Sequence, residues 1–332
     1  LFRFMLQSGL VKLLSGDDSW WNLSALSFHF ETQPLPTTLA WYANLMPEFF
    51  LQLGVVFTFI VELVIPFLIL MPRRPRQVAA LSIVVFQIMI FVTGSYNYFN
   101  LLTIALCLLL LDDQAYRSLI PRGLAPLLRQ PLAAHKPSLR SAVPVTIALV
   151  YILLSSIILS VTGHRSQLSN TSRTVLSWAQ PFHIANGYGL FAAMTKTRPE
   201  IIIEGSMDGR DWKAYELPFK PGAVNRAPVW ATPHQPRLDW QLWFAALAPA
   251  ERNPWFRELM HRLLMGSEPV LALFEVNPFP DDPPRFLRAG LYQYHFSSEP
   301  KRKKTGNWWT REFDHEFFPV IQLSVSKRQT IP

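Results

Sequence analysis

Four long apolar runs in the first half of the chain constrain its fold more than any other feature. They are Phe49 to Met71, Gln77 to Thr93, Tyr98 to Leu111 and Val143 to Val161. A helix needs roughly 20 apolar residues to cross a bilayer, and these runs leave too little polar surface for core helices of a soluble protein. Positions 1–161 hold 17 of the 54 charged side chains, and positions 162–332 hold the other 37. We therefore expect a multi-span α-helical membrane domain over 1–161 and an exported domain over 162–332.

The distribution of Lys and Arg between the loops predicts the orientation of these spans. Positions 72–77, PRRPRQ, contain three arginines and no acid, and positions 112–142 contain five basic residues and two aspartates. Positions 15–48 contain four acids and no Lys or Arg. Basic loops stay in the cytoplasm, so the first two segments are predicted to be cytoplasmic. By alternation, positions 15–48, 94–97 and 162–332 are predicted to be non-cytoplasmic.

We therefore expect an integral membrane protein, located in the endoplasmic reticulum of a eukaryote or the inner membrane of a bacterium. The chain opens with LFRFMLQSGLVKLL, which lies within an apolar segment and lacks the layout of a signal peptide. We expect further spans before it. The sequons at Asn22 and Asn170, on the side predicted to be external, are candidate glycan acceptors in a eukaryotic host.

Composition argues against several classes of chemistry. The single cysteine, Cys107, lies within an apolar run, so a disulfide within the chain, a CxxC pair and a cysteine-rich zinc site are excluded. Hydrolase, metalloprotease, nucleotide-loop and dinucleotide motifs are absent. The net charge of +8 needs no nucleic-acid partner, because much of it belongs to the cytoplasmic loops. We expect no metal and no cofactor.

The exported domain has the patterns of a β-rich fold with inserted helices. PEIIIEGSMDGRDWKAYEL has two strand-like runs around Asp208 and Gly209, a hairpin signal. RFLRAGLYQYHFSS alternates apolar and polar side chains, which is typical of another strand. Between them lies a helical pattern in which Asn253 and Pro254 mark a start and Gly266 a stop. We expect a sandwich-like β-rich domain.

Aromatic and charged side chains gather in one stretch of this domain, PHQPRLDWQLWF. Such clusters suit a protein interface or a buried ion pair. Structural packing, a partner-binding surface and catalysis stay open as alternatives. The candidate client-binding residues are His234, Arg237, Asp239, Trp240 and Trp243. The run KRKK, Lys301 to Lys304, is either a solvated loop or a contact with anionic lipid headgroups.

Four long strings carry a resemblance to a known family. They are SGLVKLLSGDDSWWNLSALSFHFETQPLPTTLAWYANLMPEFF, NGYGLFAAMTKTRPEIIIEGSMDGRDWKAYELPFKPG, ATPHQPRLDWQLWFAAL and NPFPDDPPRFLRAGLYQYHF. Together they resemble the lipase maturation factor family over nearly the whole chain. The resemblance implies a multi-span membrane protein, in animals of the endoplasmic reticulum, that newly made lipases need in order to become active. The near absence of cysteine departs from any redox-linked version of that role.

The membrane half is also similar, over KLLSGDDSWW and the histidine that follows, to vitamin K-dependent gamma-carboxylase and its bacterial relatives. That resemblance implies a base at Lys12. It gives an alternative function, a membrane-embedded proton-transfer enzyme whose pocket is lined by Lys12, His29, Glu31 and Glu62. Glu62 lies mid-span in FIVELVIPF, where a carboxylate needs a partner or a cavity.

The simpler interpretation of the acidic stretch is a re-entrant or surface loop anchored at the headgroup level by Trp20, Trp21, Trp41 and Tyr42. A third function, carbohydrate or peptide capture, is suggested by IEGSMDGRDW, which is similar to strings in discoidin-type domains. The overall expectation is a membrane-anchored, chaperone-like maturation factor, and the proton-transfer enzyme stays open as the alternative. Its expected partners are client proteins such as lipases and membrane lipid.

Overall fold

The computed structural model describes residues 1–119, 142–160, 162 and 169–323. The chain divides into two compact units, and each consists of several chain segments. The first unit contains Leu1–Ala25, Phe49–Ile88 and Leu101–Met194, and the second contains Leu26–Glu48, Met89–Asn100 and Thr195–Pro332. These units group the segments differently from a single cut after residue 161. That predicted boundary, between membrane and exported residues, stays a prediction.

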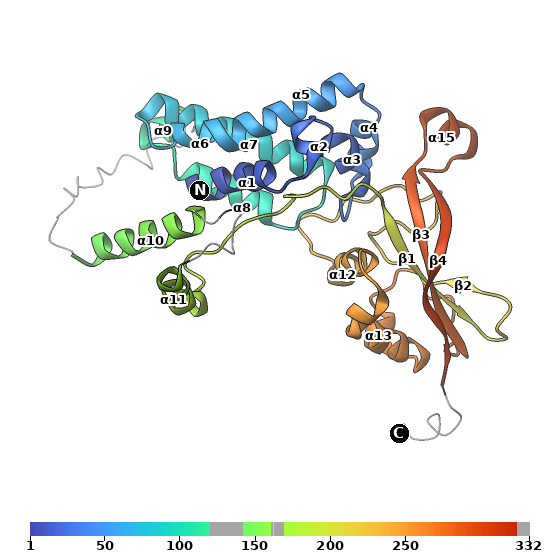
Figure 1. Ribbon diagram of the computed structural model, residues 1–332. Coiled ribbons are helices and arrows are strands. Elements are labelled where there is room, and N and C mark those ends of the chain that lie inside the picture. The colour runs from blue at the N-terminus through green and yellow to red at the C-terminus, as the bar shows by residue number, and fades with distance from the viewer. Residues whose placement is uncertain (120–141, 161, 163–168, 324–332) are drawn as a thin grey trace. The chain divides into compact units, whose positions relative to one another are not determined.

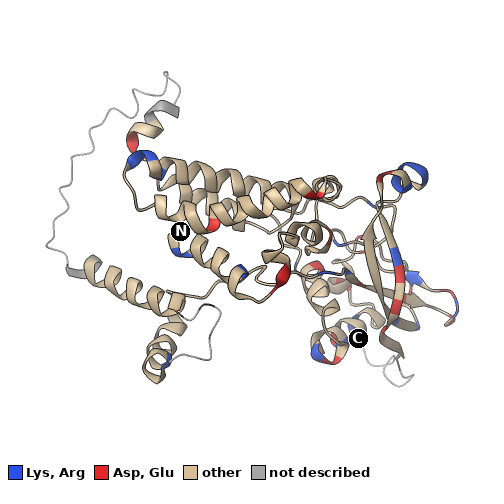
Figure 2. Ribbon diagram, turned by 45° about the horizontal axis from the view of Figure 1, so that its top comes forward, with Lys and Arg blue, Asp and Glu red and all other residues tan. Residues whose placement is uncertain are grey.

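The first unit is helical. Its elements are α1 (Phe2–Leu14), α2 (Asp18–Trp21), α5 (Glu48–Phe59), the π-helix η1 (Ile60–Val64), α6 (Ile65–Leu68), α7 (Arg73–Thr93), α8 (Phe99–Leu108), α9 (Asp113–Leu119), α10 (Ala142–Ser160), α11 (Asn170–Ala179) and the 3-10 turn η4 (Gln180–Phe182). Charged residues are sparse along the long helices and gather near their ends (Figure 2). Hydrophobic side chains on these helices are exposed in large numbers, which suits lipid contact.

Two of the four predicted spans have the length and composition of a membrane-crossing helix in the described residues. They are Glu48–Leu68, built from α5, η1 and α6, and Arg73–Thr93. The apolar helix Phe99–Leu108 has ten residues and rises only about 15 Å, which is half of the hydrocarbon thickness. The fourth predicted run forms α10, whose apolar side chains such as Ile147 and Leu149 are exposed.

The second unit contains one antiparallel sheet with strand order β2-β1-β3-β4. Its strands are β1 (Pro199–Ser206), β2 (Lys213–Ala214), β3 (Phe286–Phe296) and β4 (Trp309–Gln322). The helical elements are α3 (Ala25–Thr32), α4 (Thr38–Asn44), α12 (Arg237–Ala246), η5 (Ala250–Arg252), α13 (Pro254–Leu264), α14 (Glu268–Leu271) and α15 (Glu299–Thr305). The predicted β1–β2 hairpin is present, and Gly209 in its turn has a φ of 76°.

The core of this unit lies between one face of the sheet and helices α12 and α13 (Figure 1). Alternation along β1 places Ile201 and Ile203 on that face, while Ile202 packs with Tyr294 and Trp309 on the other. Helix α13 begins after Asn253 and its stop residue Gly266 has a φ of 67°, as predicted. In the described residues the layer that covers the sheet is helical, so the sandwich-like packing is helix on sheet rather than sheet on sheet.

Two segments from the membrane half belong to this second unit, and they pair with each other. Pro36 forms an isolated antiparallel bridge with Gly94, and the Ser95 amide donates to the Leu35 carbonyl over 3.0 Å. The Gln33 side chain also donates to the Thr93 carbonyl over 2.9 Å. The acidic stretch after α2 is therefore a docking segment of the sheet-containing unit.

Candidate functional site

The predicted client-binding residues lie on α12 and just before it, and burial separates them into two groups. His234 and Arg237 are exposed, and Trp240 is half-buried. Asp239 and Trp243 are buried. The first three side chains are accessible to a partner protein, whereas the last two have structural contacts.

Asp239 holds the start of α12 to the preceding loop. Its carboxylate accepts hydrogen bonds from the Phe219 amide over 3.0 Å and the Lys220 amide over 2.8 Å. Burial raises the pKa of Asp239, and these two amides and the Lys220 charge oppose that rise. A carboxylate bonded in this way fixes the loop against the start of α12.

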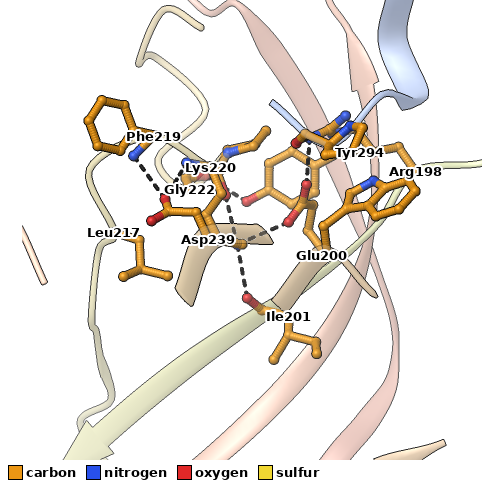
Figure 3. A network of polar contacts seen from close by, with 12 residues as sticks. Arg198, Glu200, Ile201, Leu217, Phe219, Lys220, Gly222, Asp239 and Tyr294 are labelled. Atoms are coloured by element: carbon orange, nitrogen blue, oxygen red, sulfur yellow. Dashed lines mark hydrogen bonds and ion pairs between the residues drawn. The ribbon is translucent and has the colours of Figure 1, made fainter. Parts of the chain in front are cut away.

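A buried charge network lies beside this loop (Figure 3). Glu200 pairs with the Arg198 guanidinium over 2.8 Å and with Lys220 Nζ over 3.0 Å. Lys220 Nζ also donates to the carbonyls of Ile201 and Pro221. Two cations and two carboxylates, Asp239 included, balance to zero charge, which is the condition for burying them together.

The network also attaches the docking segment. Arg198 donates to the carbonyls of Glu31, in the last turn of α3, and of Gln33 and Pro34 just after it. Trp243 Nε1 donates to the Thr32 carbonyl over 3.1 Å. Sequence reasoning missed Arg198, Glu200 and Lys220. Arg198 immediately precedes β1 and Glu200 lies two residues later, next to the apolar run Ile201 to Ile203. Two opposite charges at this spacing beside a buried apolar run are a signal that would have suggested a buried pair.

The outward face of α12 is apolar and carries one guanidinium. We call it the α12 surface, and it consists of His234, Arg237, Trp240, Phe244 and Leu247. Phe244 is 57% exposed and Leu247 44% exposed. The Trp240 ring lies between those of Tyr96 and Phe244, with centroids 6.2 and 6.3 Å away. Sequence reasoning missed Phe244, although positions 237, 240, 244 and 247 have the spacing of a single helix face.

The alternative catalytic residues divide between the two units. Lys12 and Glu62 meet in the first unit, where Lys12 Nζ contacts Glu62 Oε2 at 2.7 Å, Oε1 at 2.9 Å and the Ser8 carbonyl at 3.0 Å. Both side chains are 7% exposed. The π-helix Ile60–Val64 carries Glu62, and the Trp20 ring lies 5.3 Å from the ammonium. All three N–H donors of Lys12 are therefore used within the protein.

His29 and Glu31 belong to the second unit and have partners there. His29 lies 3.4 Å from the Tyr96 hydroxyl. The Glu31 carboxylate contacts His295 Nδ1 at 2.9 Å and accepts from the Phe296 amide over 2.8 Å. These contacts attach α3 to the end of β3, and a pocket shared with Lys12 stays a prediction.

The predicted membrane-interface anchors differ in exposure. Trp20 is 3% exposed and Trp41 1% exposed, so their rings pack inside the protein and lack the surface that lipid contact requires. Trp20 Nε1 donates to the Phe191 carbonyl over 3.1 Å. Trp21 and Tyr42 are 65% and 51% exposed, and for them the anchoring role stays a prediction.

Comparison with known proteins identifies the family. A family model described as the lipase maturation factor transmembrane domain matches residues 1–118, and one described as the lipase maturation factor C-terminal domain matches residues 184–319. The chain belongs to the lipase maturation factor family. The family resemblance predicted from the sequence is thus confirmed, and the chain is a membrane protein with a transmembrane domain followed by a sheet-containing domain.

The curated relatives agree with this assignment. Lipase maturation factor 2 of Mus musculus is 35% identical over 100% of this chain and 60% of its own length. The Homo sapiens protein of the same name is 34% identical with the same coverage, and lipase maturation factor 1 of Mus musculus is 33% identical over 97% of this chain and 59% of its own length. The chain spans about 60% of the length of these relatives. No solved structure shows significant similarity to the chain.

Proposed function

We propose that this chain is a membrane-anchored maturation factor for secreted lipases, which holds the client through its sheet-containing unit on the non-cytoplasmic side. The observation that carries the proposal is the match to both domains of the lipase maturation factor family over residues 1–118 and 184–319. The relatives are themselves named as lipase maturation factors. The expected clients are accordingly lipases in the course of folding or assembly.

The set of chain segments that forms the second unit supports the proposed orientation. The unit consists of three segments, Leu26–Glu48, Met89–Asn100 and Thr195–Pro332. The charge distribution places each segment on the non-cytoplasmic side or at the end of a span that faces this side. A unit that packs as one body must lie on one side.

The two loops that are predicted to be cytoplasmic contact each other, which agrees with their placement on the same side. Arg73, at the start of α7, pairs with Asp112 over 2.6 Å and bonds to the Gln114 side chain. Asp112 and Gln114 belong to the second loop that is predicted to be cytoplasmic. Both loops therefore meet at one end of the helical unit, as alternation requires.

The α12 surface is the part of the unit best suited to hold a client. Aromatic and guanidinium groups supply most of the affinity in typical protein interfaces, and this surface combines Trp240, Phe244 and Arg237. Two buried groups on the inner face of the helix, Asp239 and Trp243, hold it rigidly. A rigid, partly apolar surface binds an incompletely folded protein at a low entropic cost.

The test is a double variant of the exposed residues, Arg237→Ala with Phe244→Ala. It is expressed with a secreted lipase in cells that lack their own maturation factor, and lipase activity is divided by the amount of lipase protein. We expect this specific activity to fall at least about tenfold, because each side chain of this type contributes roughly 2 kcal/mol or more at an interface centre. The matched control is Arg257→Ala with Phe313→Ala, which removes an arginine and a 61% exposed phenylalanine elsewhere in the unit. Equal activity in the two variants, at equal levels of folded protein, contradicts the proposed binding surface.

A further inference from the structure

The sheet-containing unit contacts the end of one candidate span and is followed directly in the chain by another. The Thr37 hydroxyl donates to the Val92 carbonyl over 2.6 Å, and the Thr37 amide donates to the Thr93 carbonyl, in the last turn of the apolar helix α7. At its other end, α4 finishes at Asn44, and the other candidate span, Glu48–Leu68, begins shortly after it. Helix α4 is therefore held between the ends of two spans.

Apolar side chains are exposed around both attachments. On α4 and just after it, Leu39 is 48% exposed, Leu45 41% exposed and Met46 42% exposed. Trp230 is 47% exposed, and its ring packs 5.1 Å from that of Phe91 in α7. A tryptophan beside the last turn of a span lies at the depth where aromatic side chains are enriched in membrane proteins.

A cluster of cations lies on α15 of the same unit (Figure 2). Lys301, Lys303 and Lys304 are exposed, and with Arg302 and Glu299 they give this helix a net charge of +3. Lys303 also pairs with Glu299 at 2.5 Å, one turn away in the helix. The charge of the helix is thus strongly positive even after its internal ion pair is counted.

Helix α15 is fixed to α4 through aromatic rings. The Arg302 guanidinium lies 3.6 Å from the centre of the Trp308 ring and 4.8 Å from that of Trp41. Trp41 is the buried tryptophan of α4, and its Nε1 donates to the Ser297 carbonyl over 2.9 Å just before α15. The Thr38 hydroxyl donates to the Pro228 carbonyl over 2.7 Å, which brings the Trp230 loop to the start of α4. These contacts hold the three elements together.

We propose that the surface of these three elements binds anionic lipid headgroups of the membrane that the chain spans. We call it the α4–α15 surface; it consists of Leu39, Tyr42, Trp230, Lys301, Lys303 and Lys304. The exposed apolar groups suit the boundary between headgroups and acyl chains, and lysines suit phosphate groups above it. Lipid is the occupant because the polypeptide keeps α4 within four residues of one span and in contact with the end of another. Each lysine near an anionic surface contributes about 1 kcal/mol, roughly a fivefold change in affinity.

The binding is measured on the full chain in nanodiscs. A fluorophore is attached at Thr305→Cys in a Cys107→Ala background, and its quenching by headgroup-labelled nitroxide lipid reports the approach of α15 to the bilayer. We expect quenching to be stronger in discs of phosphatidylglycerol and phosphatidylcholine in equal parts than in phosphatidylcholine alone. High salt removes the difference, because it screens exposed charges.

The variant Lys301→Gln, Lys303→Gln, Lys304→Gln tests the assignment and keeps Arg302 on its tryptophans. We expect it to abolish most of the difference in quenching between anionic and phosphatidylcholine discs, because the loss of three lysines weakens the attraction of α15 to anionic headgroups by more than about tenfold. The control Arg210→Gln, Arg252→Gln, Arg257→Gln removes three exposed cations from other elements of the same unit and is expected to retain the preference for anionic lipid. Equal quenching in both lipid compositions, or an equal loss in the control, overturns the proposal. A lysine variant that keeps its lipid preference but loses lipase maturation instead assigns the lysines to an acidic protein client, which also overturns it.

Discussion

Lys12 and Glu62 are the residues for which a structural role and a catalytic role lead to the most different predictions. The ammonium uses its three N–H donors on the Ser8 carbonyl and the two oxygens of Glu62. A buried pair of this kind is held against a large desolvation cost, and removal of one partner leaves the other charge uncompensated. If the chain acts only by holding a client, Lys12→Ala is expected to change lipase maturation only slightly. The geometry instead predicts that this change destabilises the helical unit.

We predict that Lys12→Ala lowers the stability of the chain by about 3–5 kcal/mol, and that Lys12→Met combined with Glu62→Met restores most of it. Both variants are measured as thermal unfolding of the full chain in detergent micelles. Lipase maturation is then measured for the folded double variant. If the double variant folds normally but supports no maturation, the pair performs chemistry and the proton-transfer enzyme becomes the better account.

The client-binding candidates that the sequence singled out lie on α12 and just before it, and their role in binding stays a prediction. The functional distinction within that set depends on which face of α12 is covered, and the sequence of α12 alone carries no information on its neighbours. Asp239 and Arg237 are both charged, yet Asp239 is buried and bonds to a loop, whereas Arg237 is exposed. Arg198 was missed because its acceptors at Glu31, Gln33 and Pro34 are backbone carbonyls, which every residue has.

At the scale of elements, the contact between α1 and the π-helix depends on a glycine. A Cβ atom at Gly9 would lie 2.5 Å from Leu63 Cδ2 and 3.1 Å from Glu62 Cβ. This close approach brings Lys12, one turn further along α1, to Glu62. The π-helix has i→i+5 hydrogen bonds, and its wider turn shifts Glu62 relative to its position in a regular α-helix. Gly9 and the π-helix therefore both affect the contact between Lys12 and Glu62.

We predict that Gly9→Ala destabilises the chain by about 1–3 kcal/mol, the usual cost of inserting a methyl group into a packed contact. Leu63→Ala in the same chain makes room and should recover part of the loss. The control is Gly189→Ala, where a Cβ meets no atom within 4 Å. Thermal unfolding in micelles measures all four proteins. Equal melting temperatures for Gly9→Ala and Gly189→Ala would show that α1 and η1 are not packed as described.

The elements that the sequence predicted well were those with local signals. The β1–β2 turn has Asp208 and Gly209, and α13 has a proline at its start and a glycine at its stop. Strand β4 was missed because residues 311–316 are all exposed, so no alternation between buried and exposed positions exists there. The π-helix was missed because its sequence, IVELV, has the composition of an ordinary span.

At the scale of the whole molecule, the sequence predicts the two kinds of region but not how the chain is shared between them. The docking segment Leu26–Glu48 and the loop Met89–Asn100 pack with residues more than 90 positions away in sequence. Their contacts are mostly hydrogen bonds to backbone groups, such as Trp243 Nε1 to the Thr32 carbonyl. Such contacts carry no compositional signature, and only the three-dimensional structure reveals them.

The predicted orientation is testable with single cysteines in a Cys107→Ala chain. Arg210→Cys lies in the exposed β1–β2 turn of the second unit, and Arg74→Cys lies at the start of α7 beside the paired loops. A membrane-impermeant maleimide added to sealed vesicles of known orientation should label Arg210→Cys only from the non-cytoplasmic face and Arg74→Cys only from the cytoplasmic face. The reason is that the 21-residue candidate span Arg73–Thr93 separates the basic loop from the residues that pair with the docking segment. Detergent-opened vesicles control for accessibility, because both cysteines should then react fully. Labelling of both cysteines from one face would mean that α7 does not cross the bilayer, and the assignment of the sheet-containing unit to the side where secreted lipases fold would fail with it.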